Sequence, residues 1–362
     1  MTPAAMAGGA WLDSTHPCPG GNRTDALWRD EDGTLWVGCG TNAVGYGLVY
    51  SQDGGVAWQQ APTSPSDILD AFRVSSISRG HDGALYIAGF NAGNRDMVLR
   101  LATAGVPFAV TRTLVGTNTL GRQFHVGTYR ELADGRAIAE SLNGYELLYR
   151  PDTTVGSAAA DWISAAQPYQ ILDLVVHDDL FWGVGSRIVE PPRLFLPPTT
   201  PAAPPWQFEI DTLPVDGHVG ELWGVAVNDA RLVGVGVDQD TDDGWIFVSG
   251  PDPYDTTDYV QWSLSGILDS NGASWARGVC MRGARIVAVG ERQPLSLGTG
   301  VVVQSLDGGA SFSDITPDGV SGSVSRCVIE PDGTLVVVGA AGYVGILVRD
   351  PVIFGSGFEP VQ

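Results

Sequence analysis

The densest group of potential metal ligands in the chain lies in the stretch VDQDTDDGW, at residues 237–245. Asp238, Asp240 and Asp242 alternate there, and Asp243 is followed by a glycine. Hard cations such as Ca²⁺ are bound by several oxygen ligands, and a glycine permits the sharp turn of a calcium loop. The spacing is one residue longer than D-x-D-x-D-G, so two interpretations stay open: a calcium site or a solvated acidic loop. No other cofactor is expected.

Arginines recur near the starts of segments that we assign below to the innermost strand of a repeat. They are Arg23, Arg73, Arg277 and Arg326, and more loosely Arg122, while Arg292 stands beside Glu291 after a repeat-ending glycine. A guanidinium binds a carboxylate or sulfate through two parallel hydrogen bonds. These six arginines are therefore candidate ligand-binding residues. The alternative is that each pairs with an aspartate of the neighbouring repeat, as structural ion pairs often do.

Catalytic groups are harder to place. The five histidines show no H-x-H or H-E-x-x-H spacing, so a zinc site is not indicated. His125 and Tyr129 could act as base and acid in polysaccharide β-elimination, or they are ordinary strand residues. Glu291 and Asp238 are the carboxylates that a glycoside hydrolase or lyase would use. No G-x-S-x-G motif and no phosphate-binding loop occurs.

A repeat of about 50 residues organises the chain, which is the length of a β-propeller blade. Seven apolar segments carry it: GTLWVGCG, GALYIAGF, GRAIAESL, DLFWGVGS, ARLVGVGV, ARIVAVGE and GTLVVVGA. A short strand precedes each segment, usually across an Asp-Gly turn, and a third strand follows it. A fourth strand is expected to begin at an aromatic residue: Trp58, Phe108, Trp162, Trp206, Trp262 or Phe312. Four short strands per repeat predict an all-β, seven-bladed propeller.

The seventh repeat has no fourth strand of its own. The N-terminal segment GGAWLDS, at residues 8–14, is a candidate to complete it, with Trp11 at its start. Joining the two ends of the chain in one blade closes the ring and removes exposed strand edges. We therefore expect a single domain over residues 1–351 and a C-terminal tail over 352–362. The apolar run at 333–348 is rich in glycine and shorter than a membrane span, so it predicts two strands.

Two copies of the pattern S-x-D-G-G-x-x-aromatic occur about 250 residues apart, as SQDGGVAW at 51–58 and SLDGGASF at 305–312. They resemble the Asp-box, or BNR-repeat, motif. That superfamily includes sialidases, other glycoside hydrolases and lyases, lectins and photosystem II assembly-factor-like proteins, and this repeat pattern is most similar to the last group. The resemblance implies that Asp53 and Asp307 are structural residues of an outer corner, closed by Trp58 and Phe312.

Composition limits the partners. The formal net charge is −21, which repels nucleic acid and other polyanions. The four cysteines contain no C-x-x-C pair, and Cys18 and Cys39 fall at the same end of the first blade, where a disulfide is plausible. Whether Cys280 and Cys327 pair stays open. The N-terminus lacks a signal peptide, which we expect to have been removed from a secreted or periplasmic monomer.

The sequence favours a secreted binding module that recognises a glycan or a protein surface at the mouth of the propeller. A carbohydrate-active enzyme, either hydrolase or lyase, is the first alternative, and a periplasmic assembly factor is the second. The fold alone does not decide between them, because propellers host many activities.

Overall fold

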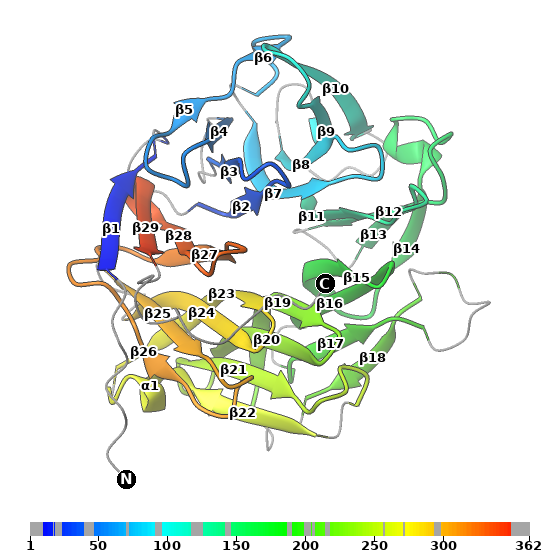
Figure 1. Ribbon diagram of the computed structural model, residues 1–362. Helices are drawn as coiled ribbons and strands as arrows, with labels where there is room; N and C mark the ends of the chain where they lie inside the picture. Colours follow the sequence, from blue (N-terminus) through cyan, green and yellow to red (C-terminus); the bar gives the residue numbers. More distant parts are fainter. Residues whose placement is uncertain are drawn as a thin grey trace, which may run out of the picture.

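Each of the seven repeats forms one antiparallel sheet, and the sheets are arranged radially around a common centre in the computed structural model (Figure 1). The structure describes residues 10–16, 18, 24–39, 47–69, 72–90, 96–116, 126–141, 146–186, 190–198, 204, 207–213, 218–255, 258–270, 272–292 and 298–348. This arrangement confirms the prediction of a seven-bladed propeller with four-stranded blades.

The blades are numbered here in chain order, and their strands run from the centre outward. Blade one contains β2 (Ala26–Arg29), β3 (Leu35–Gly38), β4 (Leu48–Ser51) and β5 (Gln59–Gln60). Blade two contains β7 (Arg73–Arg79), β8 (Leu85–Phe90), β9 (Asp96–Ala102) and β10 (Phe108–Val115). Blade three contains β11 (Val126–Glu131), β12 (Ala137–Ser141), β13 (Glu146–Arg150) and β14 (Ile163–Ala166). Blade four contains β15 (Gln170–His177), β16 (Leu180–Ser186), β17 (Arg193–Leu196) and β18 (Glu209–Thr212).

The remaining blades follow the same order. Blade five contains β19 (Gly220–Asn228), β20 (Arg231–Asp238), β21 (Asp243–Ser249) and β22 (Tyr259–Ser263). Blade six contains β23 (Ser274–Arg282), β24 (Arg285–Arg292), β25 (Thr299–Ser305) and β26 (Ser313–Asp314). Blade seven contains β27 (Val324–Ile329), β28 (Leu335–Gly339) and β29 (Tyr343–Val348), with β1 (Ala10–Thr15) as its outer strand.

The N-terminal strand closes the ring as expected. β1 pairs antiparallel with β29 from Ala10 opposite Val348 to Thr15 opposite Tyr343, and the two strands lie side by side in Figure 1. The apolar run at 333–348 forms β28 and β29, which are strands and not a membrane helix. No helix of the described part is long and apolar enough to cross a membrane.

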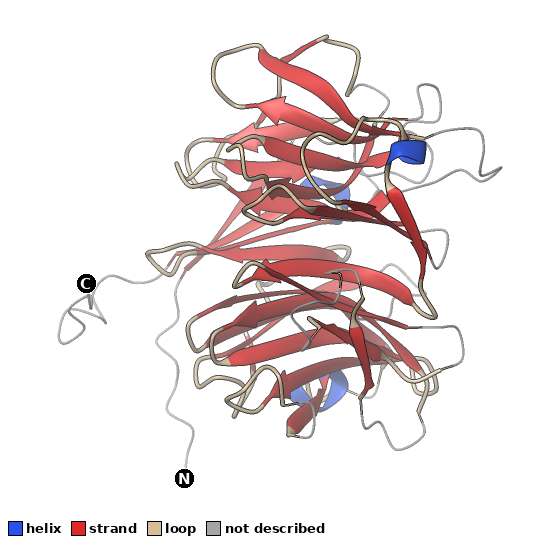
Figure 2. Ribbon diagram, turned by 90° about the vertical axis from the view of Figure 1, so that its right-hand side faces the viewer, coloured by secondary structure: helices blue, strands red, loops and turns tan. Residues whose placement is uncertain are grey.

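Three details differ from the sequence prediction. Blade two has a fifth strand, because β6 (Thr63–Ser64) pairs parallel with β10. β22 begins at Tyr259, so Trp262 lies inside the fourth strand of blade five and not at its start. Short helical turns also occur: α1 (Leu264–Ile267), η2 (Ala159–Asp161) and η3 (Ala340–Gly342). Figure 2 shows how little of the chain these turns occupy beside the strands.

The core consists of apolar layers between neighbouring blades. One layer joins Leu35 and Val37 of blade one to Val336, Val338 and Ile346 of blade seven, all of them buried. The second and third strands read as continuous apolar runs because both of their faces are covered by adjacent blades. β-Branched residues suit such doubly packed strands.

The innermost strands of blades two to seven share a register shift near their starts, where each pairs with the second strand of its blade. We call the residues that directly follow this shift the bulge layer. They are Ser76, Thr128, Asp173, Gly224, Gly278 and Arg326. Beside the shift the strands approach so closely that a Cβ at Gly290 would lie 1.9 Å from the carbonyl oxygen of Trp275. The repeat-ending glycine is therefore required by backbone contact.

The two ends of the ring differ. At the end where the first and second strands of each blade connect, polar contacts join all seven pairs of neighbouring blades. They are Arg29–Glu330, Arg79–Asp30, His81–Glu131, Ala133–Asp179, His177–Asp229, Asn228–Gly283 and Arg285–Gly333. We call this the stapled end. The opposite end, where innermost strands begin, is called the entry end.

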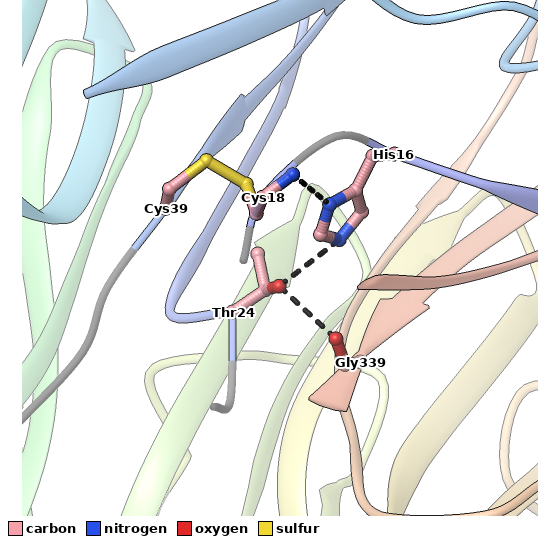
Figure 3. Close-up of a disulfide and its surroundings, with 5 residues drawn as sticks. All are labelled: His16, Cys18, Thr24, Cys39 and Gly339. Carbon is pink, nitrogen blue, oxygen red and sulfur yellow. Dashed lines mark hydrogen bonds between the residues drawn. A yellow bond between two sulfur atoms is a disulfide. The ribbon is translucent and has the colours of Figure 1, made fainter. Parts of the chain in front are cut away.

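His16 and a disulfide hold the ring closure at the entry end (Figure 3). Cys18 and Cys39 form the expected disulfide, and a second disulfide joins Cys280 to Cys327 on adjacent innermost strands. The Cys18 amide donates to Nδ1 of His16 (3.3 Å), so Nε2 carries the ring hydrogen and faces Thr24 Oγ1 (3.2 Å). Thr24 in turn donates to the Gly339 carbonyl of blade seven (3.0 Å). Both ring nitrogens of the neutral imidazole therefore have a hydrogen-bond partner.

Candidate functional site

The two copies of the serine–aspartate–glycine pattern fold into the same outer corner. Asp53 Oδ1 accepts from Ser51 Oγ (2.8 Å) and from the Ala57 amide (2.9 Å). Asp307 Oδ1 accepts from Ser305 Oγ (2.7 Å) and from the Ser311 amide (2.9 Å). These hydrogen bonds hold the pKa of both carboxyl groups below its ordinary value. Both carboxylates are therefore used in hydrogen bonds within their own corner, as in an Asx turn.

The aromatic residues at these corners anchor them. Trp58 donates from Nε1 to the Gly55 carbonyl (2.8 Å) within its own corner. Phe312 packs against Trp262 of blade five, with ring centroids 5.5 Å apart. Trp262 donates from Nε1 to the Gly309 carbonyl of the second corner (3.0 Å). The corners therefore tie outer strands together, away from the innermost strands.

Three of the candidate ligand-binding arginines form ion pairs with carboxylates: Arg73, Arg292 and Arg277. Arg73, the first residue of β7, pairs with Asp25 of blade one at 3.4 Å. Arg292 pairs with Asp314 of its own blade at 2.8 Å. These contacts agree with the alternative interpretation, in which the arginines form structural ion pairs and do not bind a ligand. Arg23, Arg122 and His125 lie outside the described residues.

Arg277 lies inside β23, not before it, at the position of the register shift. Its guanidinium is 4.3 Å from the ring centroid of Trp223 and 4.5 Å from that of Trp275. Glu291 accepts from its Nε at 2.7 Å. Trp223 belongs to blade five and donates from Nε1 to Glu221 (2.8 Å). The result is a half-buried aromatic and charged cluster at the entry end, which we call the Trp–Arg cluster.

Arg326 has no carboxylate partner among the described residues. It lies inside β27 in the bulge layer, and its Nη1 donates to the main-chain carbonyls of Arg277 (3.1 Å) and Ser325 (2.8 Å). Among the described residues, no carboxylate therefore compensates the charge of this guanidinium beside the Trp–Arg cluster. Arginine in such a setting retains donors for an external carboxylate.

Arg130, which sequence analysis did not single out, reaches the same layer from blade three. Its Nη1 donates to Ser76 Oγ (2.7 Å), and its Nη2 lies 3.8 Å from Asp173 Oδ1. Ser76, Asp173 and Arg326 are register equivalents in blades two, four and seven. Burial lowers the pKa of Arg130, and the positive charge of Arg326 lowers it further, whereas Asp173 raises it. The charge of Arg326 in blade seven thus acts unfavourably on Arg130, and Asp173 of blade four is the carboxylate that acts favourably on it.

Glu140 is the second unexpected group. It stands on β12 opposite Thr128, is 2% exposed, and neither of its carboxylate oxygens has a hydrogen-bond partner among the described residues. Burial and the nearby Asp173 raise its pKa well above the ordinary value, which favours the neutral form of the group. Other blades have Val or Ala in this register position, namely Ala88, Val184, Val235, Val289 and Val338. Glu140 is therefore a polar replacement inside an apolar layer.

The remaining catalytic candidates are dispersed. Tyr129 is fully buried, stacks on Tyr86 at 5.1 Å, and has a raised pKa because of burial. Glu291 is engaged by Arg277, and Asp238 lies on blade five beside His218. No hydrogen bond or ion pair joins Glu291 to Asp238 among the described residues. An acid–base pair or a carboxylate pair remains a prediction without support from this geometry.

The acidic loop has a different ligand group from the one expected. His218 Nδ1 lies 3.0 Å from Asp238 Oδ2 and 3.7 Å from Asp240 Oδ2, and these three atoms form a group that could hold an ion. Asp242 is not part of this group. It adopts a left-handed conformation (φ 56°), and its carbonyl accepts from the Ser274 amide. Calcium binding by Asp238, Asp240 and Asp242 stays a prediction.

Comparisons with known proteins show the fold. No protein-family model matches the chain, and no curated protein matches it in sequence. Among solved structures, YCF48 bound to D1 peptide has a TM-score of 0.63 at 16% identity, covering 94% of this chain and 97% of that one. A catalytically inactive virginiamycin B lyase from Staphylococcus aureus, solved with quinupristin, has a TM-score of 0.63 at 11% identity, covering 94% and 99%. The WD40 propeller domain of Doa1 has a TM-score of 0.59 at 12% identity, covering 96% and 100%.

Proposed function

We propose that this protein is a binding propeller whose entry end recognises a carboxylate-bearing segment of a protein partner. The observation that carries the proposal is the pair Arg130 and Arg326: Arg326 belongs to the bulge layer, the side chain of Arg130 reaches that layer, and Asp173 is the single carboxylate near Arg130 among the described residues. A ligand carboxylate would relieve their repulsion and accept charge-assisted hydrogen bonds from Arg326. On a chain of net charge −21, such a local positive site is selective.

The Trp–Arg cluster supports the same surface as a binding site. Tryptophan, tyrosine and arginine dominate the binding energy of protein interfaces, and here Trp223, Trp275 and Arg277 stand together beside Arg326. Trp275 Nε1 is buried and has no hydrogen-bond partner among the described residues. The solved structure of YCF48 with a D1 peptide is a precedent for a propeller of this fold that binds a polypeptide.

The two disulfides favour an oxidising compartment, so the proposal places the protein outside the cytoplasm, secreted or periplasmic, as a monomer. A periplasmic assembly factor is one protein of this kind. The stapled end gives the ring the rigidity that a binding surface needs, because each neighbouring pair of blades is joined there.

The test is retention of peptides from a random library with free C-terminal carboxylates, compared with the same library amidated at the C-terminus and with Asn and Gln in place of Asp and Glu. We expect the wild-type protein to retain carboxylate-bearing peptides and the Arg326→Gln variant to lose them. Arg292→Gln is the matched control, because Arg292 already pairs with Asp314. Retention that ignores the peptide carboxylates would contradict the proposal.

A parallel incubation with neutral and acidic polysaccharides separates the other functions. Binding of an acidic polysaccharide with no peptide retained would replace the protein partner by a glycan. New oligosaccharides detected by mass spectrometry would make the protein a hydrolase, and unsaturated ends would make it a lyase.

A further inference from the structure

The acidic loop of blade five carries an arrangement that a salt bridge does not explain. Asp238 is 4% exposed, and its Oδ1 accepts from the Asp240 amide (2.8 Å) and more weakly from the Thr241 amide (3.4 Å). These two bonds fix the carboxylate and leave Oδ2 directed at His218 Nδ1, 3.0 Å away. Yet Nδ1 is a buried atom that forms no hydrogen bond with any described residue. The His218 nitrogen and the Asp238 oxygen are thus in contact without a hydrogen bond between them, which indicates that a third partner is missing.

Asp240, from the same loop, adds a second carboxylate to His218 and Asp238. Asp240 Oδ2 lies 3.7 Å from His218 Nδ1 and accepts from the Val219 amide at 3.0 Å. The ligand atoms of all three residues lie within 4.8 Å of one another. Backbone amides therefore orient both carboxylates, as outer-shell groups do at metal centres. A cation between the three atoms would satisfy the orphaned nitrogen and both oxygens.

We propose that His218, Asp238 and Asp240 bind a divalent first-row transition-metal ion such as Zn²⁺. An imidazole nitrogen beside two carboxylates suits this class of ion, whereas calcium takes oxygen ligands only and more of them. Three protein ligands leave coordination positions open. The site lies where the chain enters β19 of blade five, the blade that also carries Trp223, and so at the entry end.

A second histidine group in the structure serves as an internal contrast. His177, Asp178 and Asp229 also lie within reach of one ion, but at the stapled end. Their aspartate side chains are 72% and 93% exposed, and no buried orphan atom is among them. Solvated carboxylates of this kind gain little from an ion. The proposal therefore concerns His218 and not His177.

The experiment is calorimetric titration of tag-free, EDTA-treated protein with Zn²⁺ and separately with Ca²⁺, at pH 7.5. We expect one equivalent of Zn²⁺ to bind more tightly than calcium. His218→Gln and Asp240→Asn should each weaken Zn²⁺ binding at least tenfold. Asp240 is half exposed, so the second variant tests the site even if the first folds poorly. Co²⁺ loaded in place of Zn²⁺ should give visible absorption bands that His218→Gln changes.

Two matched controls complete the test. Asp242→Asn changes a neighbouring carboxylate outside the group, at a left-handed position that asparagine tolerates, and His177→Gln removes the contrasting histidine. Both should stay within threefold of the wild-type affinity. The proposal is overturned if Zn²⁺ does not saturate one site, or if His218→Gln binds like the wild type. Calcium binding that is tighter than zinc binding and is lost in Asp242→Asn would establish the calcium loop instead.

Discussion

Arg326 donates a hydrogen bond from Nη1 to the main-chain carbonyl of Arg277, 3.1 Å away, across the junction of blades six and seven. The two arginines are neighbours, but only one of them has a carboxylate partner among the described residues. Arg277 is paired with Glu291 and lies against the rings of Trp223 and Trp275, whereas Arg326 has no such partner in the described part of the chain and its charge acts on Arg130. A binding function and a structural function can therefore be separated by mutating them in turn.

The first prediction concerns stability. Arg277→Gln leaves the carboxylate of Glu291, which is 12% exposed, without its partner, and should destabilise the fold by about 1–3 kcal/mol. Arg326→Gln removes a repulsion and should leave the free energy of unfolding unchanged or slightly raised. Urea denaturation of both variants at pH 7 measures this. A larger loss for Arg326→Gln than for Arg277→Gln would show that Arg326 is structural.

The second prediction concerns Glu140. Its pKa is raised above the unfolded value, so the folded chain binds more protons, and the stability it contributes at low pH is lost as the pH rises toward its folded pKa. Glu140→Val introduces the residue found at this register position in blades four to seven. We expect it to raise the free energy of unfolding at pH 8 by about 1–2 kcal/mol and to flatten its decline with pH. A destabilised variant would mean that Glu140 has a partner that favours its charge.

The third prediction concerns His16. Burial lowers its pKa to about 4, so between about pH 6.5 and 4 the unfolded chain binds the extra proton and stability falls as the pH falls. Over that window the loss should be about 3 kcal/mol. His16→Gln should remove this part of the acid sensitivity, whatever it costs at neutral pH. Denaturant titrations at pH 4 and pH 7 measure the difference, and an unchanged difference would refute the neutral, hydrogen-bonded imidazole.

The fourth prediction concerns the disulfide that closes blade one. The Cys18–Cys39 bridge joins residues 21 positions apart in the sequence. Removing it should lower the free energy of unfolding by about 3 kcal/mol, because the unfolded chain gains conformational entropy when this loop is no longer closed. Cys18→Ser with Cys39→Ser, compared by thermal denaturation with the wild type, measures it. The intact mass of the non-reduced protein should be lower than that of the reduced protein by four hydrogens. Titratable thiols in the native protein would contradict the two pairings.

The fold was accessible from sequence because each blade repeats a local pattern. The apolar segment that ends in glycine, the preceding Asp-Gly turn and the aromatic residue depend on contacts within about 50 residues, so they recur visibly. Glu140 could have been found in the same way, because aligning AES at 139–141 with VVG at 337–339 places a carboxylate at a valine position. The alignment shows the exception but not that the group is buried without a partner.

The site was less accessible because it is built between blades. Arg130 and Trp223 meet their partners only when innermost strands of different blades are brought into register. Sequence analysis placed Arg277 and Arg326 near the starts of innermost strands, and they lie inside β23 and β27; it did not show that Glu291 pairs with the first. A single histidine carries no metal-binding spacing, since the two aspartates of its group follow it by about 20 residues.

The most direct measurement of the central claim is the affinity of a retained, fluorescently labelled peptide for the wild-type protein and for Arg326→Gln, with Arg292→Gln as control. The binding function predicts at least a tenfold weaker affinity for Arg326→Gln, about 1.4 kcal/mol. It also predicts an unchanged affinity for Arg292→Gln and a similar loss when the peptide carboxylate is amidated. Equal affinities of the wild type and Arg326→Gln would contradict recognition of a carboxylate at the centre of the ring.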